Sequence, residues 1–216
     1  MESPFCVSDL ALKNPDFALI ETLGWTGREL ARLDLHLVRL ARGAQFLGMK
    51  VDLVQAQDLL KAATLPDRPA RLRLTCKLSG ALEVVASDMP AAQMIWRVGL
   101  SNMTLDPHDP YLQIKSTHRP VYDAARQHMA PQFDEMILTN AQSEVCDGTI
   151  TTVFFDRGQG LCTPPQTAGL LPGILRQEML SKGLCREETL MAQDLHKVRL
   201  FVGNALRGLI EANFYP

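Results

Sequence analysis

The feature that most constrains the fold is a change in the period of the apolar residues along the first half of the chain. Between residues 29 and 48, apolar side chains recur at helical spacing from Leu33 to Leu47, which predicts an amphipathic helix. Residues 71–78 alternate between polar and apolar side chains, which predicts a half-buried strand before a hairpin turn at Ser79 and Gly80. A chain that passes from one period to the other predicts an α/β or α+β fold.

Further segments of both kinds follow. Asp52 predicts the N-cap of a second helix that ends near Ala63, and Pro172 predicts the first turn of a helix that ends near Gly183. We also expect strands over 17–25, 81–86, 93–100, 135–140 and 149–155, a helix over 120–130, and a final helix, strand and helix over 187–213. The prolines of 105–111 predict a linker at 107–111 between a domain over 1–106 and a domain over 112–216.

Composition narrows the class of protein. The chain has 216 residues and a net charge of -2, which gives no overall attraction to nucleic acid or to an anionic membrane. It has no apolar run of about 18 residues, so no membrane-spanning helix is expected. The N-terminus lacks the pattern of a secretion signal. Five scattered cysteines without a close pair predict reduced thiols in a cytoplasmic protein, with neither disulfides nor a metal site.

Three groups along residues 115–176 have the chemistry of a cofactor site. Lys115 follows a short apolar segment, and a partly buried lysine is a nucleophile suited to imine chemistry. Asp147 supplies a carboxylate in the segment Ser-Glu-Val-Cys-Asp-Gly-Thr at 143–149, and Pro172 and Gly173 open a helix whose free N–H groups at Ile174 and Leu175 can bind phosphate. A lysine, a carboxylate and a helix N-terminus are the groups that hold pyridoxal 5′-phosphate by its aldehyde, ring nitrogen and phosphate.

Each group also has an ordinary structural interpretation. Lysines are mostly solvated at the surface, and an Asp-Gly pair such as Asp147–Gly148 is common in hairpin turns. Arg39 follows His36 by three residues on the first predicted helix and is either a phosphate ligand or a polar-face arginine. The glycine-containing turn around Asn204 and Ala205 is also typical of plain loops.

The succession of motifs resembles the fold-type IV pyridoxal-phosphate enzymes, the class IV aminotransferase family. Lys-Ser-Thr-His-Arg-Pro-Val-Tyr at 115–122 is similar to the family's Lys-Thr-Thr-x-Arg-x-x-Tyr, and His36 to Leu40 is similar to its His-x-x-Arg-Leu. Glu-Val-Cys-Asp-Gly at 144–148 is similar to its Glu-Val-x-Glu-Gly. Ile-Glu-Thr at 20–22 and the turns around 169–176 and 201–208 also match, so the resemblance covers about residues 17–210.

The resemblance implies a fold and a set of roles. It implies a two-domain enzyme, with a small N-terminal α/β domain and a larger C-terminal pseudo-barrel domain, that forms a homodimer. Lys115 is then the catalytic lysine that bonds covalently to the cofactor. The remaining implied cofactor contacts are Asp147 at the ring nitrogen and Arg39, Ile174, Leu175, Asn204 and Ala205 on the phosphate side.

The reaction stays open between three alternatives. The segments at 32–37 and 115–119 look closest to aminodeoxychorismate lyases, which form 4-aminobenzoate for folate biosynthesis and release pyruvate. The second alternative is an aminotransferase of the branched-chain or D-amino-acid type. The third is a non-catalytic relative, suggested by an aspartate at 147 in place of glutamate, by Thr152 in place of asparagine, and by the short segment before residue 17.

Overall fold

The structure, a computed structural model, describes residues 14–216. The N-terminal sequence judged above for a secretion signal lies outside these residues. The chain divides into two compact units, the first reaching Ala91 and including Gln113–His118, the second formed by Ala92–Leu112 and Arg119–Pro216. The linker at 107–111 stays a prediction; these residues belong by contact to the second unit.

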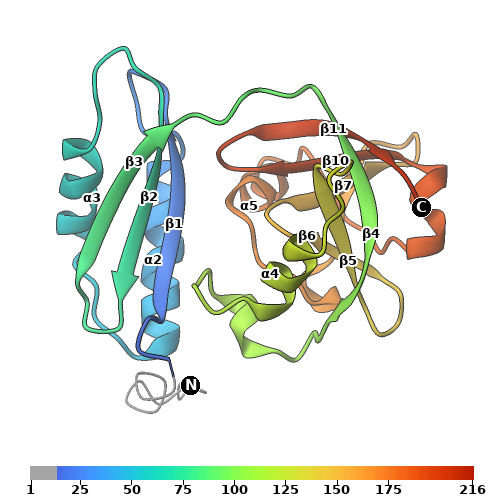
Figure 1. Cartoon of the computed structure of the whole chain (residues 1–216), viewed down its shortest axis with the longest axis horizontal. Helices are drawn as coiled ribbons and strands as arrows, with labels where there is room; N and C mark the ends of the chain where they lie inside the picture. Colours follow the sequence, from blue (N-terminus) through green and yellow to red (C-terminus); the bar gives the residue numbers. More distant parts are fainter. Residues whose placement is uncertain (1–13) are drawn as a thin grey trace. The chain divides into compact units, whose positions relative to one another are not determined.

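The first unit is a three-stranded antiparallel sheet with two helices (Figure 1). Its elements are β1 (Ala18–Trp25), α2 (Leu33–Leu47), α3 (Leu53–Ala62), β2 (Ala70–Lys77) and β3 (Leu82–Asp88). The strand order is β1-β2-β3. All five elements were predicted from the sequence, α2 and β2 from the two apolar periods, α3 from the N-cap at Asp52 and β3 from the hairpin turn before it.

The helix ends of the first unit follow local chemistry. Gly48 ends α2 in the left-handed region, at φ 70°, and its N–H donates to the carbonyl oxygens of Ala44 and Gln45. A carboxylate oxygen of Asp52 accepts the Gln55 N–H at 2.9 Å and starts α3 as expected. The helix predicted from residue 29 begins later, because Arg32 precedes α2 in the left-handed region, at φ 57°.

The second unit is built on an eight-stranded sheet of order β6-β5-β4-β11-β10-β7-β8-β9, which curls in Figure 1. Its strands are β4 (Ile95–Leu105), β5 (Glu135–Asn140), β6 (Val145–Gly148), β7 (Thr152–Asp156), β8 (Leu161–Thr163), β9 (Arg186–Glu187), β10 (Arg199–Asn204) and β11 (Gly208–Phe214). Its helices are α4 (Pro120–Gln127) and α5 (Ile174–Ser181), with 3-10 turns η1 (Pro110–Gln113), η2 (Gln166–Ala168) and η3 (Ala192–Lys197). The mixed α/β fold with a curled sheet confirms the predicted fold class.

The expected final helix was wrong. The last element is β11, which pairs antiparallel with β10 and parallel with β4. Its residues include good helix formers, but Ile210 and Ala212 are buried at alternate positions between two strands. Sheet pairing therefore overrides local helix propensity here.

Among residues 14–216, no helix is long and apolar enough to cross a membrane. Cys76, Cys146, Cys162 and Cys185 are all buried free thiols.

Candidate functional site

Lys115 is held by its backbone along the edge of β1 in the first unit. The Ile20 N–H donates to the Lys115 carbonyl oxygen at 2.9 Å. Thr117 pairs with Ala18 through its own N–H at 2.8 Å and through its hydroxyl, which accepts the Ala18 N–H at 3.0 Å. The side chain of Lys115 is half-buried. The segment around Lys115 therefore pairs with β1 like a short extra strand, and this pairing fixes the position of the Lys115 backbone.

A buried carboxylate lies beside this segment and binds two basic side chains of α2. Glu21 on β1 accepts hydrogen bonds at 2.8 Å from Nε and at 2.5 Å from Nη2 of Arg39. Nδ1 of His36 lies 2.6 Å from the same carboxylate. All three side chains are buried, so His36 and Arg39 face the sheet rather than solvent, and the hydrogen bonds to Glu21 explain this orientation.

The cluster fixes the charges of its members. Burial would raise the pKa of Glu21, but Arg39 and His36 together hold it at about 2, so the carboxylate is ionised. Burial lowers the pKa of His36, as does the charge of Lys115, although the hydrogen bond to Glu21 opposes both. His36 is therefore neutral at pH 7, donates from Nδ1, and leaves its Nε2 buried without a hydrogen-bond partner among the described residues.

Asp147 lies on β6 in the second unit and has a different environment. One carboxylate oxygen, Oδ2, accepts the Tyr122 hydroxyl at 3.3 Å and the Leu171 N–H at 3.4 Å. The other oxygen, Oδ1, is buried and accepts no hydrogen bond from residues 14–216. Burial, with a contribution from the charge of Glu135, raises the pKa of Asp147 to about 8. A carboxyl group with one unused buried oxygen is suited to meet a charged N–H group.

The helix predicted to bind phosphate begins close to Asp147 in space, although it lies well beyond Asp147 in the sequence. Leu171, which donates to Asp147, is followed by Pro172 and by Gly173, the N-cap of α5. The first N–H groups of α5, at Ile174 and Leu175, have no acceptor within the helix. A Cβ at Gly173 would lie 2.7 Å from Oγ1 of Thr152, so the threonine that departs from the family's asparagine lies directly against this turn.

The turn between β10 and β11 lies next to the same helix. A Cβ at Gly203 would come within 2.8 Å of the Leu175 side chain. Asn204 uses its side chain to hold the turn: its Oδ1 accepts the N–H groups of Leu206 and Arg207, at 3.1 and 3.0 Å, and its Nδ2 donates to the Ile150 carbonyl oxygen at 3.2 Å. Ala205 is the next residue of the turn.

The structure therefore gathers the candidate residues into two sets. The second unit brings together Asp147, Ile174, Leu175, Asn204 and Ala205, and the first unit brings together Lys115 and Arg39. The residues of the second unit fit pyridoxal 5′-phosphate, because Oδ1 of Asp147 can accept the ring N–H and the start of α5 offers N–H groups to a phosphate.

Three residues that organise the candidate site were missed as such from the sequence. Glu21 was noted only as part of a matching strand. The available signal in the sequence was a carboxylate placed between Ile20 and Leu23 in a largely apolar strand, and the structure shows that it is buried. Tyr122 was assigned to one side of a helix, and Glu135 to the start of a strand. Nothing in the sequence around these two residues shows that they are tied to the region of Asp147.

Comparisons with known proteins agree with this geometry. The family model described as amino-transferase class IV matches residues 18–213. A Schizosaccharomyces pombe protein named "Putative aminodeoxychorismate lyase" is 29% identical over 180 residues, which cover 79% of this chain and 76% of that protein.

Solved structures share the fold. A "Putative amino-acid aminotransferase" from Mesorhizobium loti has 39% identity and a TM-score of 0.87, covering 93% of this chain and 100% of that one. The 4-amino-4-deoxychorismate lyase of Pseudomonas aeruginosa has the same fold at 19% identity, with a TM-score of 0.78 over 99% of this chain and 88% of that one. The chain thus belongs to the class IV aminotransferase family, whose members are enzymes that depend on pyridoxal 5′-phosphate.

Proposed function

We propose that the chain is a lyase that converts 4-amino-4-deoxychorismate into 4-aminobenzoate and pyruvate, a reaction that serves folate biosynthesis. The observation that supports this best is the S. pombe relative, which carries the lyase name over three quarters of both chains. The segments at 32–37 and 115–119, which resemble those of the lyases, support it independently of any overall identity.

The residues have distinct tasks in this proposal. Lys115 would hold the cofactor covalently, and its free amine would take the proton from the substrate carbon that bears the amino group. Asp147 would accept a hydrogen bond from the ring nitrogen, while Arg39 and the first N–H groups of α5 would bind the phosphate. When bound, pyridoxal 5′-phosphate withdraws electrons from the substrate carbon that loses the proton. The C–O bond to the enolpyruvyl group then breaks, the ring becomes aromatic, and the departing enolate takes up a proton as pyruvate.

A second candidate is an aminotransferase that acts on amino acids. The M. loti protein favours it, since that protein carries an aminotransferase name and is 39% identical. Both reactions begin with removal of a proton from the carbon that bears the amino group, so the same residues serve both. They differ in whether a leaving group departs or a keto acid accepts the amino group.

One experiment separates the two candidates. The holoprotein is incubated with 4-amino-4-deoxychorismate alone, and separately with amino donors and keto acids. We expect pyruvate and 4-aminobenzoate in equal amounts without any keto acid. Turnover only in the presence of a keto acid would select the aminotransferase, and absence of both reactions would contradict the proposal.

The role of Lys115 has its own test. Borohydride reduction of the holoprotein followed by peptide mapping should attach the cofactor to Lys115 alone. Lys115→Ala should abolish the attachment, whereas Lys61→Ala, which removes an exposed lysine of α3, should leave it unchanged. Attachment in the Lys115→Ala variant would show that another lysine reacts.

The homodimer implied by the resemblance is also part of the proposal. Light scattering of the holoprotein should give twice the chain mass of 24.0 kDa. A cytoplasmic location is consistent with the four buried free thiols among residues 14–216.

A further inference from the structure

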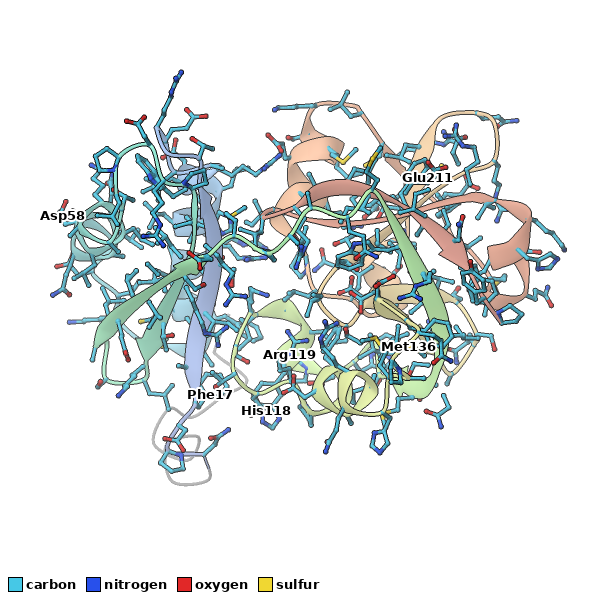
Figure 2. All side chains as sticks on the ribbon, turned by 45° about the horizontal axis from the view of Figure 1, so that its top comes forward. Phe17, Asp58, His118, Arg119, Met136 and Glu211 are labelled. Carbon is cyan, nitrogen blue, oxygen red and sulfur yellow. The ribbon has the colours of Figure 1, made fainter. Side chains whose placement is uncertain are left out.

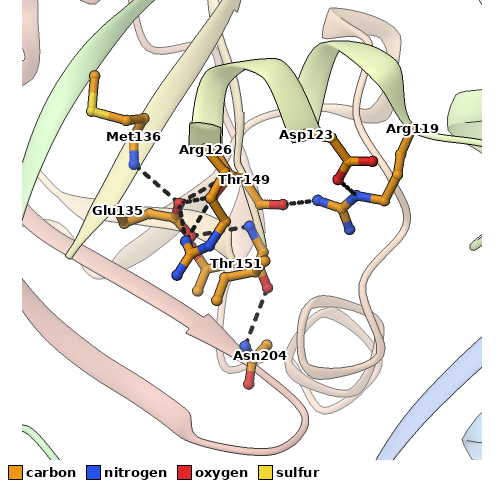
Figure 3. A network of polar contacts seen from close by, with 9 residues as sticks. Arg119, Asp123, Arg126, Glu135, Met136, Thr149, Thr151 and Asn204 are labelled. Carbon is orange, nitrogen blue, oxygen red and sulfur yellow. Dashed lines mark hydrogen bonds and ion pairs between the residues drawn. The ribbon is translucent and has the colours of Figure 1, made fainter. Parts of the chain in front are cut away.

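A fully buried carboxylate at the start of β5 organises the loop that follows Asp147. One oxygen of Glu135, Oε1, accepts the N–H groups of Thr149 at 2.9 Å and Met136 at 3.0 Å, and also the Thr149 hydroxyl (Figure 3). The other oxygen, Oε2, accepts the Ile150 N–H at 3.1 Å and the Thr151 hydroxyl at 2.8 Å. Three consecutive residues of the loop are therefore bound to one side chain.

The same carboxylate lies against the backbone next to Asp147. A Cβ at Gly148 would lie 3.0 Å from Oε2 of Glu135 and 2.4 Å from Oγ1 of Thr151. Real side chains do not approach so closely, so glycine is required at this position. The end of β6 is thus packed directly on Glu135, one residue after Asp147.

The hydrogen bonds continue from this loop to the turn predicted to bind phosphate. The Ile150 carbonyl oxygen accepts a hydrogen bond from Nδ2 of Asn204, which is the dashed line at Asn204 in Figure 3. Asn204 in turn fixes the N–H groups of Leu206 and Arg207. One chain of contacts therefore connects Glu135 with both the Asp147 strand and the β10–β11 turn.

Cations of α4 surround the loop but neutralise Glu135 only in part. Arg126 donates to the Thr149 hydroxyl oxygen at 3.0 Å, and its Nη1 lies 3.7 Å from Oε1 of Glu135. Arg119, at the start of α4 in Figure 2, donates to the Thr149 carbonyl oxygen and pairs with Asp123 at 2.9 Å. Because the Arg126 side chain is 40% exposed, water screens its charge more than that of the buried carboxylate.

Within residues 14–216, the groups that face Asp147 include no cation in direct contact. Tyr122 approaches from α4, the Leu171 N–H from the segment before α5, and the Cys146 thiol from its own strand. Glu135 acts from β5 with a like charge, and Arg119 lies over the Tyr122 ring, 5.0 Å from its centroid. The charge of Glu135 therefore opposes a second negative charge on Asp147.

We propose that Glu135 is a positioning residue for Asp147: it fixes the loop 148–151 and the β10–β11 turn, and its buried negative charge acts on the neighbouring Asp147 carboxyl. Oδ1 of Asp147 would then be held ready to accept the N–H of a protonated ring nitrogen, and an Asp147 carboxyl that carries a proton would release it to solvent as the ring binds. The inference rests on the proposed role of Asp147 and names a residue that touches neither cofactor nor substrate.

The test measures cofactor binding rather than turnover. The probe is 4′-deoxypyridoxine 5′-phosphate, which has no aldehyde and so cannot bond to Lys115, titrated by fluorescence from pH 6 to 10. Because the ring nitrogen of the free probe is already protonated over most of this range, a protonated Asp147 must release its proton on binding, so affinity should rise by up to about tenfold per pH unit below the pKa of Asp147 and level off above it. In Glu135→Gln, affinity should level off about one pH unit lower, because a like charge near Asp147 has been removed.

Two variants separate positioning from charge. Thr151→Val removes one hydrogen bond to Glu135 but keeps its charge, so affinity should drop severalfold while it still levels off at the wild-type pH. Glu211→Gln, a change at an exposed carboxylate of β11 labelled in Figure 2, should alter neither quantity.

The results that overturn the proposal are distinct. A folded Glu135→Gln protein with the wild-type affinity and pH profile would overturn both parts, and a wild-type pH profile with weaker affinity would overturn the role of the charge. If Glu135→Gln does not fold, Thr151→Val decides, since affinity within twofold of wild type would remove the positioning role. A wild-type protein that does not bind the probe at all would contradict the proposed function instead.

Discussion

Two buried carboxylates, one in each unit, have opposite ionisation. Glu21 and Asp147 are 1% and 4% exposed, so both have lost their water. Glu21 meets a guanidinium and an imidazole, which hold its pKa at about 2, whereas Asp147 meets a hydroxyl and one N–H, and its pKa rises to about 8. Burial alone does not decide the charge of a carboxyl group; the presence of a cation within hydrogen-bonding distance does.

This difference has a functional meaning in the proposed site. A carboxylate already paired with Arg39 serves to hold that arginine in place and is not available to a ligand. A carboxyl group with an unused oxygen and no cation is ready for a positively charged partner, and a protonated pyridine ring is such a partner.

The largest expected effect comes from removing the paired carboxylate. Glu21→Ala would leave Arg39 buried without its counter-ion, and breaking such a pair costs about 3–5 kcal/mol of unfolding free energy. Urea unfolding of the cofactor-free protein measures this loss. A change below about 1 kcal/mol would show that Arg39 finds another partner, and the contrast with Asp147 would then disappear.

The pH dependence of stability should separate the two carboxylates next. Glu21 contributes stability above its ordinary pKa of 4.5 that is lost as pH falls toward about 2. Asp147 contributes stability that is fully present below 3.8 and is lost as pH rises to about 8, with a slope of at most about 1.4 kcal/mol per pH unit. Between pH 4 and 8, the unfolding free energy of Asp147→Asn should therefore increase relative to that of the wild type as pH rises. Parallel curves would mean that Asp147 is ionised throughout.

A smaller effect is expected from the turn beside Asp147. Gly148→Ala places a methyl group 2.4 Å from Oγ1 of Thr151 and against Glu135, and such overpacking costs about 1–3 kcal/mol. It should also weaken binding of the cofactor analogue, because the end of β6 must move. Full retention of stability and binding would show that the loop is less tightly fixed than the contacts indicate.

The smallest effect should come from an exposed ion pair of the first unit. Arg68 and Asp88 lie 3.1 Å apart, but their side chains are 68% and 88% exposed. Asp88→Ala should change the unfolding free energy by less than about 1 kcal/mol. A loss as large as that for Glu21→Ala would contradict the view that burial determines how much an ion pair contributes to the unfolding free energy.

The sequence predicted the elements with a pronounced period and missed those whose form depends on distant partners. The amphipathic pattern of α2 and the alternation of β2 are local, and both were correct. The last segment, β11, contains residues that suit a helix, but strands β10 and β4 pair with it from both sides.

The same contrast between local patterns and distant partners applies to the candidate site. Lys115, Asp147 and the start of α5 stand in a recognisable order along the chain. The partners that set the charges of Glu21 and Asp147 are 15 to 25 residues away, as His36, Arg39 and Tyr122 show. Because such partners meet only in the folded chain, the order of motifs indicated the cofactor but not which carboxyl group would be ionised.

Carboxyl carbon NMR of the cofactor-free protein tests the contrast most directly. The resonance of Asp147, assigned with the Asp147→Asn variant, should titrate near pH 8, and that of Glu21 should show an ionised carboxylate down to about pH 2. An Asp147 resonance that titrates near its ordinary value of 3.8 would contradict the account.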